Sequence, residues 1–270
     1  MNCFKWLTLF TGDDIVKKHQ VYCMDNINDS FFDSYYKEIW KTIIPEVLTV
    51  KEVDFMIPYF NLQPGSRVLD LMCGYGRHAL ALSRKGIFVT AVDNLAAYID
   101  EIKKTAEAEH LPVETIRENV VDVTLSSPFD LAICMGNSLN FFNAGEMQKI
   151  FRAVADGLKP DGHFLINIWS IAEIVFRNFK EQTEGDVGGV KFSNTLKFCF
   201  QPTRLEITST FIKPDGETEI KTGIDYIYSL NELGNMLQSA GLWLKKIYSI
   251  PGRKEFTLGE PRAYLVAQKI

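Results

Sequence analysis

The pattern of hydrophobic positions changes twice along the chain. Residues 1–62 are rich in aromatic side chains and predict a helical segment, which ends where Asn61–Gly65 breaks the pattern. Between residues 63 and 169, apolar runs of strand length alternate with amphipathic stretches, as in a parallel sheet covered by helices. Residues 190–228 alternate apolar and polar positions with period two, which indicates a small antiparallel sheet, and 229–270 return to the earlier pattern.

Local signals set the expected elements within these regions. The expected strands are 67–71, 87–92, 129–135, 163–168, 242–250 and 260–269, and the expected helices include 77–85, 143–157 and a short one near 171–180. Capping boxes at Asn143–Glu146 and Ser229–Glu232 predict helix starts, while Gly86 and Gly241 predict helix ends. We expect turns at Lys159–Gly162 and Lys213–Gly216, and a glycine-rich link at Glu184–Gly189.

The predicted architecture is a doubly wound α/β domain with a small antiparallel β insertion and an N-terminal helical segment. Residues 63–169 and 229–270 form the main domain, residues 1–62 pack on it, and residues 170–228 are the insertion. The edge of the inserted sheet is a candidate surface for a homodimer, because exposed edges invite pairing.

Composition narrows the possible partners. The chain has 270 residues and a net charge of −5, without long basic runs, which disfavours tight binding to nucleic acid. Its cysteines are odd in number and form no C-x-x-C pair, so we expect a reduced, cytoplasmic protein without a disulfide framework or metal site. The first residues lack the features of a signal peptide, and no apolar run reaches the roughly 18 residues of a membrane span.

The candidate chemistry begins in the loop after the first strand. This loop runs from Asp70 to Arg77 and carries Gly74 and Gly76, where the missing Cβ lets backbone approach a ligand. Asp93 ends the second strand 23 residues after Asp70, where a carboxylate can accept both hydroxyls of a ribose. The alternative is that Asp93 only caps the next helix. The spacing and the place at a strand end favour a nucleotide site.

Two nucleotide classes fit this loop. Gly74, Gly76 and Ala79 also satisfy the G-x-G-x-x-A pattern of dinucleotide-binding proteins. Asp70 favours a different ligand, because a carboxylate that ends the strand is badly placed for a pyrophosphate and well placed for the ammonium group of a methionine moiety. An NAD-dependent oxidoreductase therefore stays as the alternative to a protein that binds S-adenosylmethionine.

The stretches Val68–Ala79, Val89–Asp93, Phe129–Ser138 and Leu158–Gly162 together resemble the class I S-adenosylmethionine-dependent methyltransferases. The resemblance covers roughly residues 60–169 and resumes over 229–270, and it implies the sheet order 3-2-1-4-5-7-6 with strand 7 antiparallel. Met72 stands where the family has its first loop glycine, and Asn119 stands where it usually has Asp. The implied cofactor is S-adenosylmethionine, held by Asp70, Met72, Cys73, Gly74, Gly76, Arg77, Asp93, Asn94, Leu95, Asn119, Val120 and Met135.

The insertion resembles that of the small-molecule branch, which includes sugar-amine and glycine N-methyltransferases. We therefore expect methyl transfer to an N or O atom of a small molecule, with a non-catalytic S-adenosylmethionine-binding module as a further alternative. Candidate acceptor-site residues are Tyr36, Trp40, Asn137 and Ser138.

Three candidate residues and one candidate segment have a plain structural explanation as well. Asn137 and His78 are the candidates for a catalytic role, but Asn137 could simply close a turn and His78 could be a satisfied core histidine. Arg77 could pair with the cofactor carboxylate or lie at the surface. The aromatic segment from Phe31 to Trp40 could form a lid over the cofactor or pack as an ordinary helix.

Overall fold

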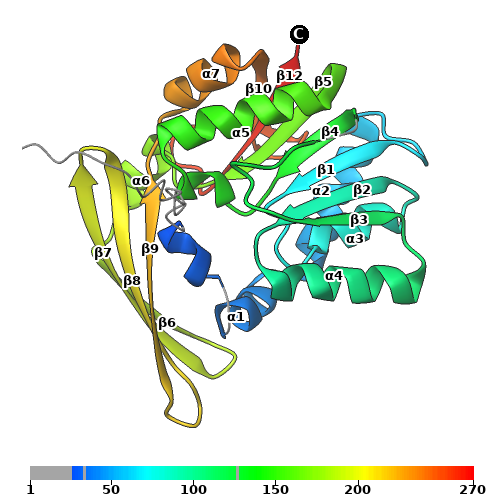
Figure 1. Cartoon of the computed structure of the whole chain (residues 1–270). Coiled ribbons are helices and arrows are strands. Elements are labelled where there is room, and N and C mark those ends of the chain that lie inside the picture. The colour runs from blue at the N-terminus through cyan, green and yellow to red at the C-terminus, as the bar shows by residue number, and fades with distance from the viewer. Residues whose placement is uncertain (1–25, 33–34, 126–127) are drawn as a thin grey trace, which may run out of the picture.

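The computed structural model describes residues 26–32, 35–125 and 128–270. Its main sheet has eight strands in the order β11-β10-β12-β5-β4-β1-β2-β3 (Figure 1). Strand β12 runs antiparallel to both neighbours. This confirms the expected order and adds the short edge strand β11. The strands are β1 Arg67–Leu71, β2 Phe88–Asp93, β3 Val113–Arg117, β4 Phe129–Cys134, β5 Leu158–Ile168, β10 Leu242–Ile250, β11 Lys254–Glu255 and β12 Ala263–Lys269.

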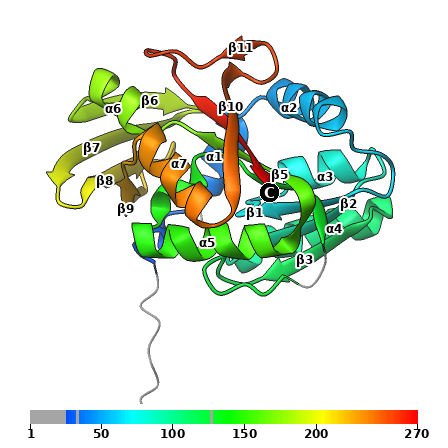
Figure 2. The same cartoon turned by 90° about the horizontal axis from the view of Figure 1, so that it is seen from above.

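Helices cover both faces of this sheet (Figure 2). They are α2 Glu46–Tyr59, α3 Arg77–Ser83, α4 Ala96–Glu109, α5 Ala144–Gly157 and α7 Leu230–Ser239. Leu69 and Leu71 of β1 enter the core with α5 and α7, whereas Val68 enters the core with α2 and α3. This division follows from the alternation of side chains along a strand. Both predicted capping boxes form, at the starts of α5 and α7.

A second, four-stranded antiparallel sheet stands beside the main one, in the order β6-β7-β8-β9. Its strands are β6 Gln182–Val187, β7 Val190–Phe200, β8 Thr203–Ile212 and β9 Thr218–Tyr226, and α6 Ala172–Asn178 precedes them. We expected a glycine-rich link at Glu184–Gly189, but most of this segment belongs to β6. Only Gly188 and Gly189 form the turn, both with positive φ. Lys213–Gly216 makes the predicted hairpin turn.

The predicted turn at Lys159–Gly162 is also different in the structure. These residues are part of β5 and form a bulge, since Phe129 pairs with Leu158 while Leu131 already pairs with His163. Asp161 takes a positive φ of 63° within this bulge. The pattern of a Pro-Asp-Gly turn was correct locally, but the flanking residues continue the strand on both sides.

The N-terminal part of the described chain contains η1 Ile27–Ser30 and α1 Tyr35–Ile43, which lie between the two sheets (Figure 1). Together with α2 they confirm helical structure in this region, and residues 1–25 of the predicted segment lie outside the described residues. None of the helices in the described ranges is both long and apolar enough to cross a bilayer.

Candidate active site

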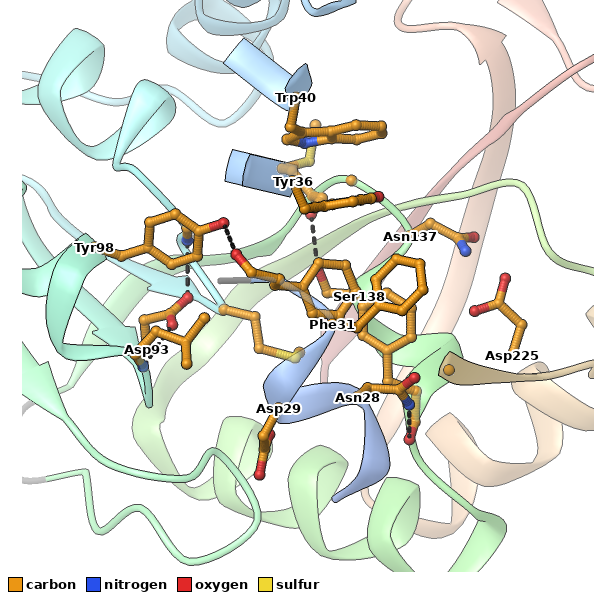
Figure 3. Close-up of a pocket in the computed structure, with 18 of the residues that line it drawn as sticks. Asn28, Asp29, Phe31, Tyr36, Trp40, Asp93, Tyr98, Asn137, Ser138 and Asp225 are labelled. Carbon is orange, nitrogen blue, oxygen red and sulfur yellow. Dashed lines mark hydrogen bonds between the residues drawn. The ribbon is translucent and has the colours of Figure 1, made fainter. Parts of the chain in front are cut away.

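A cavity of about 470 Å³ opens where the carboxyl ends of the main strands face η1, α1 and the second sheet. Its volume lies in the range of small-molecule sites. Figure 3 shows Asp93 and Tyr98 on one side of it and Asn137 and Asp225 on the other. All candidate site residues from the sequence line it except Gly76, namely Tyr36, Trp40, Asp70, Met72, Cys73, Gly74, Arg77, His78, Asp93, Asn94, Leu95, Asn119, Val120, Met135, Asn137 and Ser138.

The loop after β1 is built on three residues with positive φ. Met72, Gly74 and Gly76 have φ values of 52°, 55° and 78°. Met72 therefore adopts the conformation that glycine favours, although its side chain makes this costly. A Cβ on Gly76 would lie 2.5 Å from Cγ1 of Ile102, whereas one on Gly74 would meet nothing within 4 Å. Gly76 is thus a packing residue behind the cavity, and Gly74 keeps the cavity wall free of a side chain.

Asp93 connects this loop to the next one. Its Oδ2 accepts a hydrogen bond from the amide of Gly74 at 2.9 Å, and its Oδ1 accepts one from the amide of Leu95 at 3.0 Å. Leu95, not Asp93, is the N-cap residue of α4, so the alternative of a simple helix cap is wrong. Burial raises the pKa of this carboxyl. The amide of Asn94 also donates a hydrogen bond to it, so at least one of the roughly four lone-pair sites of the carboxylate remains for a further donor.

Asp70 carries an unsatisfied charge-bearing atom. Its side chain is only 1% exposed, and among the described residues Oδ2 has no hydrogen-bond partner. Burial raises the pKa of Asp70 to about 7, although the nearby Arg77 charge and the Ala79 amide lower it. A buried carboxylate oxygen without a donor is costly. A ligand with an ammonium group in this part of the cavity would supply that donor.

The loops after β2 and β3 complete this end of the cavity. Asn119 accepts a hydrogen bond from the amide of Val121 at 3.0 Å, which leaves its carbonyl one lone pair. Val120 is buried beside it. Asn94 donates to Oδ1 of Asp29 in η1 at 2.6 Å, so the N-terminal segment closes over these loops.

His78 and Arg77 belong to a buried network centred on Glu52 of α2. Oε2 of Glu52 lies 2.7 Å from Nη1 of Arg77 and 2.9 Å from Nε2 of His78. Tyr264 donates to Oε1 at 2.7 Å. Burial lowers the pKa of His78 to about 4 and so keeps it neutral, which supports the structural explanation of this residue. The alternative of a surface position for Arg77 is wrong, because its side chain is only 13% exposed.

Glu52 is a site residue that was not predicted from the sequence. Its four-residue spacing to the buried Met56 places it on the core-facing side of α2, and this is the signal that could have revealed a buried carboxylate.

Asn137 holds two strand ends together. Its Oδ1 accepts hydrogen bonds from the amides of Trp169 and Ser170, both at 2.8 Å, and its Nδ2 donates to Oγ of Ser170 at 2.8 Å. These partners lie more than thirty residues away in sequence, so the alternative of a locally closed turn is wrong. The same Ser170 hydroxyl donates to Oδ2 of Asp225 at 2.8 Å.

The other end of the cavity is aromatic. Tyr36 stacks on Trp40 with ring centroids 5.9 Å apart and an interplanar angle of 15°, and Trp40 lies 6.1 Å from Trp169. This wall also contains Trp169, Phe211 and Asp225, which were not predicted from the sequence. The period-two pattern of β8 and β9 holds a signal for two of them, since Phe211 shares a face with Ile207 and Asp225 shares a face with Gly223.

Comparison with known proteins identifies a methyltransferase domain in part of this chain. Residues 68–162 match the family model described as a methyltransferase domain. One relative, from Geobacillus sp. (strain WCH70), is named as a methyltransferase. It is 30% identical over 112 residues, which are 41% of this chain and 45% of the relative. The carboxy-S-adenosyl-L-methionine synthase of Yersinia enterocolitica is 24% identical over 151 residues, 52% of this chain and 56% of that protein. The chain thus spans about half the length of the curated relatives it matches.

Solved structures agree on the fold. An S-adenosylmethionine-dependent methyltransferase from Clostridium acetobutylicum matches with a TM-score of 0.74 and 18% identity, over 87% of this chain and 96% of that one. The amino pentose methyltransferase CalS10 from Micromonospora echinaspora, solved with S-adenosylmethionine bound, matches with a TM-score of 0.67 and 15% identity, over 88% and 98%. The dinucleotide alternative for the loop after β1 loses its support, because the matching family is one of methyltransferases. Residues 68–162 are therefore a methyltransferase domain, and the chain has the fold of the class I S-adenosylmethionine-dependent methyltransferases.

Proposed function

We propose that this protein transfers a methyl group from S-adenosylmethionine to an N or O atom of a small molecule, by direct in-line displacement. The observation that carries the proposal is the continuity of one cavity. The buried, unsatisfied Asp70 lies at the wall of the same space that Trp40 and Asp225 line. A cofactor and an acceptor could thus meet without crossing solvent.

The end of the cavity lined by the loops after β1, β2 and β3 fits the cofactor, because its residues have donors and acceptors available for a ligand. Asp70 would receive the ammonium group on its unpartnered Oδ2. Asp93 would accept ribose hydroxyls on its remaining lone pairs, since its two backbone bonds hold the carboxylate in place. Asn119 and the amide of Val120 would contact the adenine, and Leu95 would pack on it. When bound, the cofactor supplies a methyl group made electrophilic by a sulfonium.

The work of the protein is then to bind, align and exclude water. Aligning two reactants in a site can be worth roughly 7–11 kcal/mol as effective molarity. The carbonyl of Met135 already accepts a hydrogen bond from Ser138 Oγ at 3.2 Å, which fixes the backbone at this part of the cavity wall. This fixed carbonyl could hold a methyl group by weak C–H···O contacts.

The walls of the second end support a small acceptor. The second sheet, η1 and α1 lie beside the cofactor loops and contribute residues to the wall of this end (Figure 1). The neighbour CalS10 is an amino pentose methyltransferase by its name. The division into three regions and a homodimer through the second sheet stay predictions, and sedimentation of the purified chain would test the dimer.

The first test is binding. Calorimetric titration should show saturable binding of S-adenosylmethionine and none of NAD, and the opposite result would refute the proposal. Asp93→Ala should weaken cofactor binding by about 1–3 kcal/mol through lost charged hydrogen bonds. Asp54→Asn, at an exposed position on α2, is the matched control and should bind as the unmodified chain does.

The second test is turnover. A metabolite extract with methyl-labelled cofactor should yield a labelled small molecule, identified by mass analysis. A cofactor that binds tightly but loses no label across broad extracts would favour the non-catalytic alternative.

A further inference from the structure

Asp225 is a carboxylate that the cofactor does not explain. It lies on β9 at the cavity wall, opposite Asp93, and its carboxylate is turned toward Asn137 (Figure 3). Ser170 donates to its Oδ2, and Asn137 donates in turn to Ser170. Among the described residues, Oδ1 has no hydrogen-bond partner. The carboxylate is thus held from behind with one oxygen left for a ligand.

The cavity as a whole is short of positive charge. The described residues that line it include five carboxyl groups, those of Asp29, Asp70, Asp93, Glu118 and Asp225. Arg77 is the one lysine or arginine among these described lining residues, and its guanidinium pairs with the buried Glu52 at 2.7 Å. Since Coulomb energies are large in a site shielded from water, this lining favours a cation over a neutral or anionic ligand.

The aromatic walls near Asp225 favour the same charge. Tyr36, Trp40 and Trp169 line this end, and the rings of Tyr36 and Trp40 are nearly parallel. Aromatic faces attract cations, and the attraction grows where water is excluded. Burial and the negative charge of Asp225 raise the pKa of the Tyr36 hydroxyl, so Tyr36 stays protonated and is not a base.

We propose that the methyl acceptor is a small primary or secondary amine, which enters this end as an ammonium cation with Asp225 as its counter-ion and proton acceptor. The proposal rests on the proposed methyltransferase function and names the class of its substrate. It also assigns Ser170 and Asn137 as positioning residues that act through Asp225.

The proton balance of the reaction is simple. The ammonium gives one proton to Oδ1 of Asp225, which leaves a neutral amine with a free electron pair. A nitrogen–carbon bond then forms as the sulfur–carbon bond of the cofactor breaks, so the product leaves as a methylated ammonium cation. The proton on Asp225 returns to solvent. Burial raises the pKa of Asp225 to about 6, against the lowering effect of Ser170, which makes the carboxylate a better proton acceptor than an exposed one.

Three aromatic probes of similar size and different charge test this proposal. Benzylamine, benzyl alcohol and benzoate are titrated into the chain saturated with S-adenosylhomocysteine, and tryptophan fluorescence and calorimetry report binding. We expect benzylamine to bind at least tenfold more tightly than benzyl alcohol, and benzoate to bind more weakly still. Asp225→Asn should abolish the preference for the amine, Asp225→Glu should keep part of it, and Asp54→Asn should keep all of it.

The outcomes separate the two proposals. Failure of the chain to bind S-adenosylhomocysteine would overturn the proposed function and this inference with it. If the chain binds S-adenosylhomocysteine, three results would overturn the amine assignment alone. They are equal or tighter binding of benzyl alcohol, an amine preference that survives in Asp225→Asn, and no binding of any probe. Thermal unfolding and cofactor-product affinity of each variant verify that it is folded.

Discussion

The side chain of Asn28 pairs with the backbone of Ile224 as a neighbouring strand would. Its Oδ1 accepts from the Ile224 amide at 2.8 Å, and its Nδ2 donates to the Ile224 carbonyl at 3.0 Å. The adjacent Gly223 makes room for this contact, since a Cβ there would lie 2.8 Å from the Asn28 oxygen. One end of η1 is thus fixed to the second sheet, while Asp29 bonds to Asn94 beside the cofactor loops.

Asn28→Ala should therefore weaken cofactor binding by loosening η1. The substitution removes the two hydrogen bonds to Ile224 and a longer one to the Phe141 carbonyl, each worth about 0.5–1.5 kcal/mol, and this loss should raise the dissociation rate several-fold. Stopped-flow measurement of cofactor release checks this. Asn235→Ala, at an exposed position on α7, is the control. An unchanged release rate in a folded Asn28→Ala protein would show that η1 does not gate this end.

Met72 offers a test of backbone strain. At most positions glycine is less stable than alanine by about 0.5–1 kcal/mol. At residue 72 we expect the reverse, because φ is 52° and a Cβ there costs about 1–2 kcal/mol. Both Met72→Gly and Met72→Ala remove the long side chain, so their difference isolates the backbone. Urea unfolding of the two variants measures it, and a more stable alanine variant would contradict the expectation.

Gly76 and Gly74 form a second matched pair. Both have positive φ, but they differ in the space around an added Cβ. At Gly76 that Cβ would lie 2.5 Å from Cγ1 of Ile102, and at Gly74 it would meet nothing within 4 Å. Gly74→Ala should cost about 1–2 kcal/mol of stability from φ alone. Gly76→Ala should cost about 1–3 kcal/mol more from overpacking. Chemical denaturation gives both values, and equal losses would mean that Ile102 moves aside freely.

Asp70 predicts an opposite response of stability and of cofactor affinity to pH. Its pKa in the folded chain is raised from near 3.8 to about 7, so the folded state holds a proton that the unfolded chain has already released. Its contribution to stability is therefore lost as pH rises from about 4 to about 7. Binding of a cofactor ammonium should instead tighten over pH 6 to 7.5, as the carboxylate becomes charged.

Asp70→Asn should remove both effects. We expect the difference in stability between the variant and the unmodified chain to shift in favour of the variant from pH 5 to pH 8. We also expect the cofactor affinity of the variant not to rise with pH. Thermal unfolding and calorimetry at these pH values provide the data. If Asp70→Asn kept the same pH slope of affinity, another group would have to carry it.

Much of the fold could be predicted from the sequence because its signals are local. The strand at Arg67–Leu71, the capping box at Asn143 and the hairpin at Lys213–Gly216 each depend on residues within a few positions. The resemblance around Asp70 and Asp93 also pointed to the loops that line the cavity. Where a prediction failed, at Lys159–Gly162, a locally correct turn signal was overruled by pairing with a distant strand.

The sequence by itself determined the order of elements, the glycine loop and the acidic residues at two strand ends, since hydrophobic periodicity and backbone constraints act over short distances. Only the tertiary structure decided what faces these residues. Asp225 meets Ser170 across 55 positions, and His78 meets Glu52 across 26, because separate elements pack together there. The charge and shape of the acceptor end thus arise from contacts between distant segments. A local sequence pattern does not predict such contacts.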